Sequence, residues 1–259
     1  MSRFANLEFA GGEELPAKQR QAVGDEERCL ASAQNAFEKG DFESALRFFS
    51  RALEHNPHSI PGWTGQVRML IELGQLDQAR HWVDKALDRF PHAPDLLAAK
   101  SVALARAGDS SAAMAFSDAS MEGNATPIYA WLARGEVMLA RGETRAGFCF
   151  DKVAALARGE WIWFWLASRV HAYYQRFAQA LKLAAAALAL DGGRTVVWVQ
   201  QGLCLQALGM FEQARGSFNH ALQLDQSNED AVAGLRALNQ SGFVGRLAGL
   251  WRRFITRDS

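Results

Sequence analysis

Glycine recurs in this chain at a fixed interval, and that interval constrains the fold more than any other feature. The glycines that are 34 residues apart (74 − 40, 108 − 74 and 142 − 108) are Gly40, Gly74, Gly108 and Gly142. Gln175 occupies the next equivalent position after a step of 33, and Gly209 follows after a further 34. A period of this length is typical of architectures that stack one small unit many times. We therefore expect an array of short repeats.

Small and aromatic residues recur in phase with these glycines. The small residues five positions after each glycine or its equivalent are Ala45, Ala79, Ala113, Gly147, Ala180 and Ala214. A second set, seven residues further on, is Ala52, Ala86, Ser120, Ala154, Ala187 and Ala221, and aromatic residues open several units at Trp63, Trp131, Phe164 and Trp198. Glycine can adopt the positive φ that ends a helix, and alanine lets two helix backbones approach closely. Each unit is therefore predicted to be a pair of antiparallel helices.

These positions resemble the tetratricopeptide repeat (TPR), which implies an all-α fold: a right-handed α-solenoid of antiparallel helix pairs with a C-terminal capping helix. The six expected units are 26–59, 60–93, 94–127, 128–160, 161–194 and 195–227. A flexible tail over 1–25, a capping helix over 228–240 and a basic amphipathic helix over 241–259 are expected around them. The third unit, with Ser110 and Ser117, and the fourth, with Gly147 and Asp151, depart from the pattern and are expected to pack more loosely.

Composition and charge exclude several classes of protein. Lys plus Arg total 28 and Asp plus Glu total 28, which argues against a nucleic-acid partner, since such binders are usually basic. The three cysteines, Cys29, Cys149 and Cys204, are far apart in the sequence and suit a reducing compartment. The sequence contains no apolar run long enough for a membrane span and does not begin like a signal peptide. We expect the chain to be cytoplasmic, either free or bound peripherally at the inner face of the membrane.

No catalytic motif is recognisable. The sequence contains no phosphate-binding loop, GxGxxG, GxSxG or HExxH pattern, and no metal or cofactor is expected. His55 and His58 are close in sequence, but without further ligands they are interpreted as solvated loop residues. His171 is interpreted as a core or groove histidine, and the cysteines as small buried hydrophobic residues. An enzyme is therefore the least favoured functional class.

The first helices of a TPR array line a concave groove, where partners of such proteins usually bind. The arginine and aromatic residues at the inward-facing positions are Arg68, Arg106, Tyr129, Trp165, Arg169 and Tyr173. Because these residue types are enriched at binding hot spots, the groove is predicted to hold an acidic or acidic–aromatic protein segment. The alternative is that they are ordinary surface residues whose rings pack between helices. The set that clamps a chaperone carboxylate is absent, since those positions hold Leu30, Gln34, Gly65, Asp95 and Ala99.

Two apolar segments exceed what the repeat requires. In the run from Trp161 to Trp165, five large residues span more than one helical turn, and Trp165 is predicted to be the exposed one unless local packing hides all five. In the tail, the apolar residues and arginines that form an amphipathic basic pattern are Phe243, Leu247, Leu250, Trp251, Arg252, Arg253 and Phe254. The tail could fold back on the last repeat, bind an anionic membrane or insert into a partner.

The layout is also similar to the bacterial kinesin-light-chain-like proteins, which accompany bacterial tubulins. The residues that carry this similarity are 2–9 and 63–91. It implies an adaptor that binds a bacterial tubulin filament and links it to membrane. Tubulins are acidic, which would suit groove arginines. The alternative is a general TPR scaffold for another complex, such as an envelope or secretion assembly.

Overall fold

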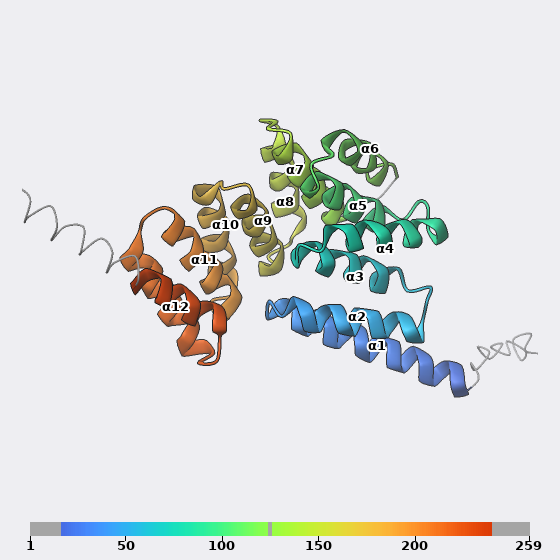
Figure 1. Cartoon of the computed structure of the whole chain (residues 1–259), viewed down its shortest axis with the longest axis horizontal. Coiled ribbons are helices and arrows are strands. Elements are labelled where there is room, and N and C mark those ends of the chain that lie inside the picture. Colours follow the sequence, from blue (N-terminus) through green and yellow to red (C-terminus); the bar gives the residue numbers. More distant parts are fainter. Residues whose placement is uncertain (1–16, 124–125, 240–259) are drawn as a thin grey trace, which may run out of the picture.

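The computed structural model describes residues 17–123 and 126–239, and this part of the chain contains helices and no strand. The labelled helices are α1 (Ala17–Glu38), α2 (Phe42–His55), α3 (Ile60–Glu72), α4 (Leu76–Arg89), α5 (Pro94–Arg106), α6 (Ser110–Ser120), α7 (Ile128–Ala140), α8 (Ala146–Leu156), α9 (Trp161–Tyr173), α10 (Phe177–Leu190), α11 (Thr195–Ala207) and α12 (Phe211–Leu224). One more helix spans 229–239. Successive pairs stack into a strongly curved superhelix (Figure 1), as the period predicted.

Each helix pair turns at the repeated glycine. Gly74 has φ +72°, its N–H donates to the carbonyl of Ile71, and the next N–H, of Gln75, donates to Leu70. The same left-handed backbone occurs at the equivalent glycines, which confirms the predicted joint. Gln175, at the equivalent position of the fifth unit, is not a glycine but also has a positive φ, +57°. The backbone geometry of the joint is therefore the same in this unit although the residue differs.

The small residues lie where helices cross. Ala45, Ala79, Ala113, Ala180 and Ala214 are all completely buried, as expected for positions that allow close backbone contact. Large residues fill the spaces beside them: the ring of Phe218 lies so close to Gly202 and Gly234 that neither could carry a Cβ without movement. Alternating small and large residues in this way gives the interior its close packing.

The fourth unit does not follow the predicted register. Gly147, Asp151 and Ala154 were aligned with buried positions of the other units, but all three are exposed. Ala146 and Phe150 are buried instead, one residue earlier in each case. The step from Gly142 to Gln175 is one residue shorter than the other steps, and the missing residue is therefore in the segment between Gly142 and the start of α8. Helix α8 begins late, at Ala146 with Arg145 as its N-cap, and is only 11 residues long.

In the third unit, serines bond to the local backbone where other units place apolar groups. Ser117 and Ser120 are buried, and the Ser120 hydroxyl donates to the Ser117 carbonyl at 2.7 Å. This bond satisfies a polar group that burial would otherwise leave costly. The looser packing expected of this unit stays a prediction.

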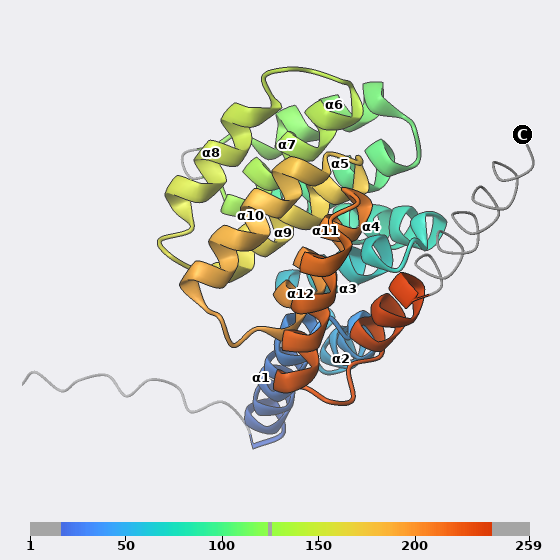
Figure 2. The ribbon, with the colours of Figure 1, turned by 90° about the vertical axis from the view of Figure 1, so that its left-hand side faces the viewer.

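The superhelix curves until its first unit meets its fifth and sixth. The end where α1 meets α2 points toward α9 and α11 (Figures 1 and 2). The rings of Phe37 in α1 and Trp165 in α9 are 5.8 Å apart, and Glu38 pairs with Arg194, just before α11, at 3.2 Å. These contacts join residues far apart in sequence, which a regular open solenoid lacks.

The ends differ partly from expectation. Helix α1 begins at Ala17, earlier than the start at residue 26 that the predicted tail implied. Helix 229–239 covers the last unit, where residues 228–240 were expected to form a cap, and it buries Ala231 and Leu238. Within the described residues, no helix combines the length and apolar character needed to cross a bilayer. The predicted tail helix over 241–259 lies outside the described residues.

The register shift in α8 can be tested by a pair of substitutions. Ala146→Leu should lower the free energy of unfolding by about 1–3 kcal/mol, because it overfills a buried crossing point. Gly147→Ala should raise it by about 1 kcal/mol, because this helical position is exposed and a Cβ there meets no atom within 4 Å. Urea denaturation of both variants measures the difference. The opposite order of stabilities would restore the register predicted from the sequence.

Candidate functional site

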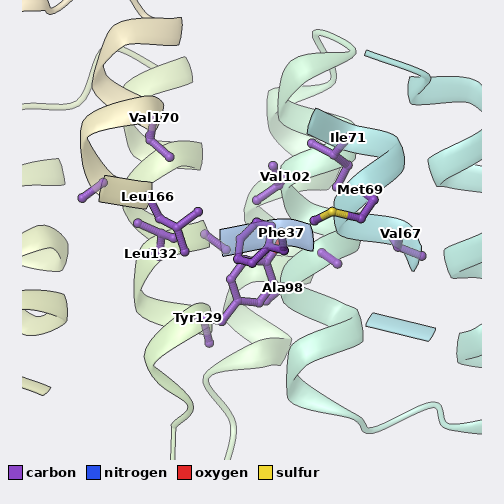
Figure 3. Close-up of a cluster of buried hydrophobic side chains, with 14 of the residues drawn as sticks. Phe37, Val67, Met69, Ile71, Ala98, Val102, Tyr129, Leu132, Leu166 and Val170 are labelled. Atoms are coloured by element: carbon purple, nitrogen blue, oxygen red, sulfur yellow. The ribbon is translucent and has the colours of Figure 1, made fainter. Parts of the chain in front are cut away.

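The inner helices direct apolar side chains toward one centre. Phe37 of α1, Ile71 of α3, Val102 of α5, Leu132 of α7 and Leu166 of α9 converge there (Figure 3). The pocket that these inner helices line has a volume of about 20 Å³, whereas ligand pockets usually enclose several hundred. The concave face in this structure is therefore a packed core and not an open groove.

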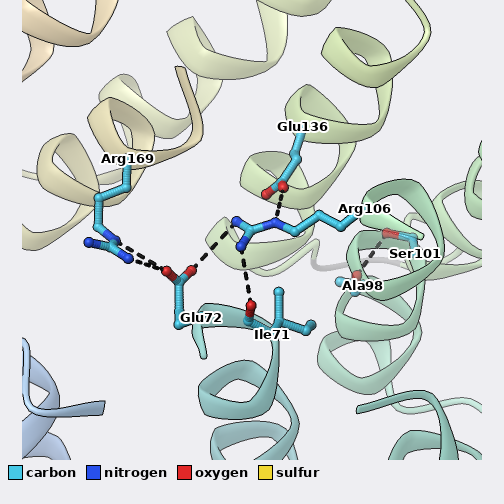
Figure 4. A network of polar contacts seen from close by, with 7 residues as sticks. All are labelled: Ile71, Glu72, Ala98, Ser101, Arg106, Glu136 and Arg169. Atoms are coloured by element: carbon cyan, nitrogen blue, oxygen red, sulfur yellow. Dashed lines mark hydrogen bonds and ion pairs between the residues drawn. The ribbon is translucent and has the colours of Figure 1, made fainter. Parts of the chain in front are cut away.

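A buried network of charges crosses this core (Figure 4). Nε of Arg106 in α5 donates to Oε1 of Glu136 in α7 at 2.7 Å. Nη2 of the same arginine lies 3.6 Å from Oε1 of Glu72 in α3. Glu72 also accepts from Nε of Arg169 of α9 at 3.2 Å, and Arg106 donates to the carbonyl of Ile71 at 3.4 Å. Four consecutive inner helices are thus tied together by opposite charges.

The network shifts the ionisation of its members. Burial alone would raise the pKa of Glu72, but Arg169 and Arg106 outweigh it and hold this pKa below its usual value. Burial raises the pKa of Glu136 even though Arg106 opposes the shift. Burial acts to lower the pKa of Arg106, but Glu136 and Glu72 overcome that effect and raise it, so the guanidinium stays charged.

Each predicted groove arginine also lies over aromatic rings. The guanidinium carbon of Arg68 is 4.3 Å from the ring centre of Tyr129, and that of Arg106 is 4.4 Å from Tyr173. Arg169 lies 5.3 Å from Trp165 and 4.6 Å from Phe42 of the first unit. At these distances cation–π attraction stabilises the arginines further. Their charges are therefore already engaged within the chain.

The structure brings all the predicted groove residues to one concave face. What it changes is their exposure and their partners: Arg106 and Arg169 face glutamates, and Arg68 is covered by rings. Tyr173 alone among the predicted aromatics keeps half of its surface exposed. A role for these six residues in binding a partner stays a prediction, and in this conformation it would require the channel to open.

The prediction that Trp165 is exposed was wrong. Its exposed fraction is 1%, because the rings of Phe37 and Phe42 from the first unit cover it. Trp161 is also buried, and Ile162, Trp163 and Phe164 are half-buried, so packing covers much of this run. The ring that was expected to bind a partner instead holds the superhelix closed.

Sequence reasoning missed two contributors to this site. Glu72 follows the inward-facing Ile71 by one residue, so the periodicity did not select it. Phe42 of the first unit contacts Trp165 of the fifth, although it is not among the predicted groove residues. Opposite charge near the inner face was the available signal for Glu72, whereas no periodic signal marks a contact between units one and five.

Other predicted features have simpler outcomes. Cys149 and Cys204 are buried thiols, as expected, and Cys29 is half-buried. No group of His, Cys, Asp and Glu within the described residues is arranged to hold a metal ion. The tail residues Phe243, Leu247, Leu250, Trp251, Arg252, Arg253 and Phe254 lie outside the described part of the chain.

The comparisons with known proteins agree with this architecture. Family models described as tetratricopeptide repeat match residues 36–103 and 196–228. A tetratricopeptide repeat protein from Parabacteroides merdae is 16% identical, with 82% of this chain and 84% of that one covered and a TM-score of 0.54. Yeast Tom70 is 15% identical over 87% of this chain and 47% of its own, with a TM-score of 0.56. PilW, a type IV pilus biogenesis factor, is 16% identical over 81% of this chain and 98% of its own, with a TM-score of 0.50.

The chain is therefore built from tetratricopeptide repeats wound into an all-α superhelix. Proteins of this class mediate protein–protein interaction, and the fold is typically a non-catalytic interaction scaffold. At these identities the solved structures establish the fold alone.

Breaking the buried network should strongly destabilise the closed superhelix. Glu136→Ala should lower the free energy of unfolding by about 3 kcal/mol, because it removes the close partner of the buried Arg106. Glu212→Ala, which removes an exposed pair with Arg215, should change it by less than about 1 kcal/mol.

A double variant separates charge from packing. Arg106→Met with Glu136→Leu should recover much of the loss, because no unpaired charge then remains at that position. Chemical denaturation of all three variants provides the measurement. Equal, small effects of Glu136→Ala and Glu212→Ala would contradict a structural role for the network.

Proposed function

We propose that this chain is a non-catalytic adaptor that holds a protein partner on its outer and edge surfaces. The observation that carries the proposal is the filled concave channel, whose arginines are paired internally. A repeat array without a free inner groove still presents a large, rigid and varied outer surface. Such surfaces suit a scaffold.

The partner we propose is a bacterial tubulin filament. The support for it is the similarity of residues 2–9 and 63–91 to the bacterial kinesin-light-chain-like proteins. The attraction expected between an acidic tubulin and the groove arginines does not add support, because Glu72 and Glu136 already neutralise Arg106 and Arg169. A general scaffold for an envelope or secretion assembly is the alternative.

Co-sedimentation of the full chain with assembled bacterial tubulin tests this partner. The chain should pellet with the polymer in a saturable manner, and it should stay in the supernatant when tubulin is kept unassembled. A chain that stays in the supernatant at every polymer concentration would remove the filament as partner. Capture of envelope proteins by the same preparation from its own cell extract would then favour the alternative.

The membrane link is proposed from the basic amphipathic pattern of residues 243–254. The full chain should float with vesicles that contain an anionic phospholipid and should not float with neutral ones. Substituting Arg252→Glu and Arg253→Glu should abolish flotation, because charge attraction is part of such binding. Equal flotation of both proteins, or none of either, would contradict the link.

A further inference from the structure

An apolar patch is exposed where α11 meets α12 in the sixth unit. Its residues are Ala207, Leu208, Met210 and Phe211, and only Gly209 interrupts the run. Leu208 is 41% exposed, Met210 is 40% exposed and Phe211 is 49% exposed. Single exposed apolar residues are common on protein surfaces, but contiguous ones mark surfaces on which something docks. We call these four residues the joint patch.

The joint patch is exposed because the array ends beside it. Phe42, Leu76 and Phe177 occupy the position of Phe211 in other units, and each of them is half-buried. Units of a repeat array shield one another in this way. After α12 the described part of the chain adds only the helix 229–239, so Phe211 lacks that cover.

The helix 229–239 leads the chain back toward the joint patch. Gly234 lies against Phe218 of α12, and Asn239, further along the chain, lies against Arg215, nearer the start of α12. The two helices are therefore antiparallel. Nη1 of Arg215 donates to Oδ1 of Asn239 at 2.9 Å, which fixes where the described chain ends.

The next residues of the chain reach the patch from this end. Phe211 precedes Arg215 by four residues, so it lies on the same side of α12 and about 6 Å further along. The four residues from Asn239 to Phe243 can span at most about 14 Å. Phe243 is therefore within reach of Phe211.

The segment that follows carries an apolar face and positive charge. Its apolar residues at helical spacing are Phe243, Leu247, Leu250, Trp251 and Phe254, which fall on one side of the predicted helix. Arg252 and Arg253 fall on the other side. Glu212, next to Phe211, has a side chain that is 91% exposed, and its ion pair with Arg215 is long, at 4.0 Å. The patch thus offers the basic segment both apolar surface and a carboxylate.

The helix 229–239 is not built to pack a further second helix against itself. In α11, Gly202 and Leu205 are buried, and Gly202 lies against Phe218 of α12. The residues 34 positions later are Arg236 and Asn239, and both are exposed. A helix packed there would cover charged and polar groups, which is costly. The tail therefore does not complete a seventh repeat, and its apolar face needs another surface.

We propose that the apolar face of residues 243–254 docks on the joint patch of the same chain. Phe243 covers Phe211, and the apolar residues that follow cover Met210 and Leu208. The tail is tethered beside its site, so its effective concentration there exceeds that of a second copy or of a separate partner.

The inference goes beyond the proposed function, because it gives the tail a binding surface on the chain itself. The same apolar residues cannot lie in a bilayer and on the joint patch at once. Binding of the tail to an anionic membrane would therefore expose the patch.

The reactivity of a thiol in the patch measures whether the tail covers it. Met210→Cys is made in the full chain with Cys29→Ser, and Phe148→Cys is the control, because Phe148 is 58% exposed on α8. Maleimide labelling is followed peptide by peptide by mass spectrometry, which separates these sites from the buried Cys149 and Cys204. Each rate is divided by the rate in the urea-denatured chain. The thiol at position 210 should react at least about tenfold more slowly than the thiol at position 148.

Tail variants identify what covers the patch. Phe243→Gln together with Leu247→Gln should raise the rate at position 210 at least about tenfold, because the apolar contact is lost. Thr256→Gln, on the opposite side of the tail's helical pattern, should leave that rate unchanged. Circular dichroism of each variant checks that the repeats stay folded.

Three results would overturn the proposal. The first is an equal rate at positions 210 and 148 in the otherwise native chain. The second is slow labelling that the double tail variant leaves unchanged. The third is slow labelling that disappears on dilution together with a dimer seen by sedimentation, which would assign the patch to a second copy.

The membrane link proposed above fails in a different way. Vesicles that contain an anionic phospholipid should speed labelling at position 210, because the tail moves to the membrane. Slow labelling that such vesicles leave unchanged would mean that the tail docks on the patch and that the membrane link fails. Flotation of a chain whose position 210 is never protected would mean the reverse.

Discussion

Opposite charges buried at the centre of the superhelix determine what kind of protein this chain can be. Arg106 and Arg169 reach inward from α5 and α9, and Glu72 and Glu136 meet them from α3 and α7. A buried charge without a partner is strongly destabilising, so these four helices are held at the separation that keeps every pair in contact. The aromatic rings of the first unit then cover the fifth, and the inner face becomes a core. The inner surface that partners of TPR proteins commonly use is filled by this chain's own side chains in this structure.

Much of the fold follows from the sequence because its causes are local. The 34-residue period predicted helix pairs, and positive φ at Gly40 and its equivalents confirmed their joints. The register of α8 could not be predicted, because the 33-residue step between Gly142 and Gln175 does not show where in the unit the missing residue lies. Closure of the array did not follow either. Small rotations between neighbouring repeats accumulate along a solenoid, and the contact between Phe37 and Trp165 has no periodic signature.

The fourth unit is where the chain departs most clearly from its repeat. Regular positions such as Ala45 and Ala79 are buried and serve packing. The fourth unit breaks this rule, because Gly147 and Asp151 are exposed and the residues one position earlier, Ala146 and Phe150, are buried. The shift of α8 could not be predicted from the sequence, since Gly147 and Asp151 indicated only a loosely packed unit.

Closure of the first unit onto the fifth, as far as the residue just before α11, is the central claim, and cross-linking measures it directly. Glu38→Cys and Arg194→Cys replace an ion pair that joins residues 156 apart in sequence. With the half-buried Cys29 changed to serine, a short bismaleimide should consume both new thiols within one chain and leave the monomer mass increased by one linker. Single-cysteine variants give the background. Separate capping of the two thiols, or links only between chains, would mean that the array is open and that its concave face is available to partners.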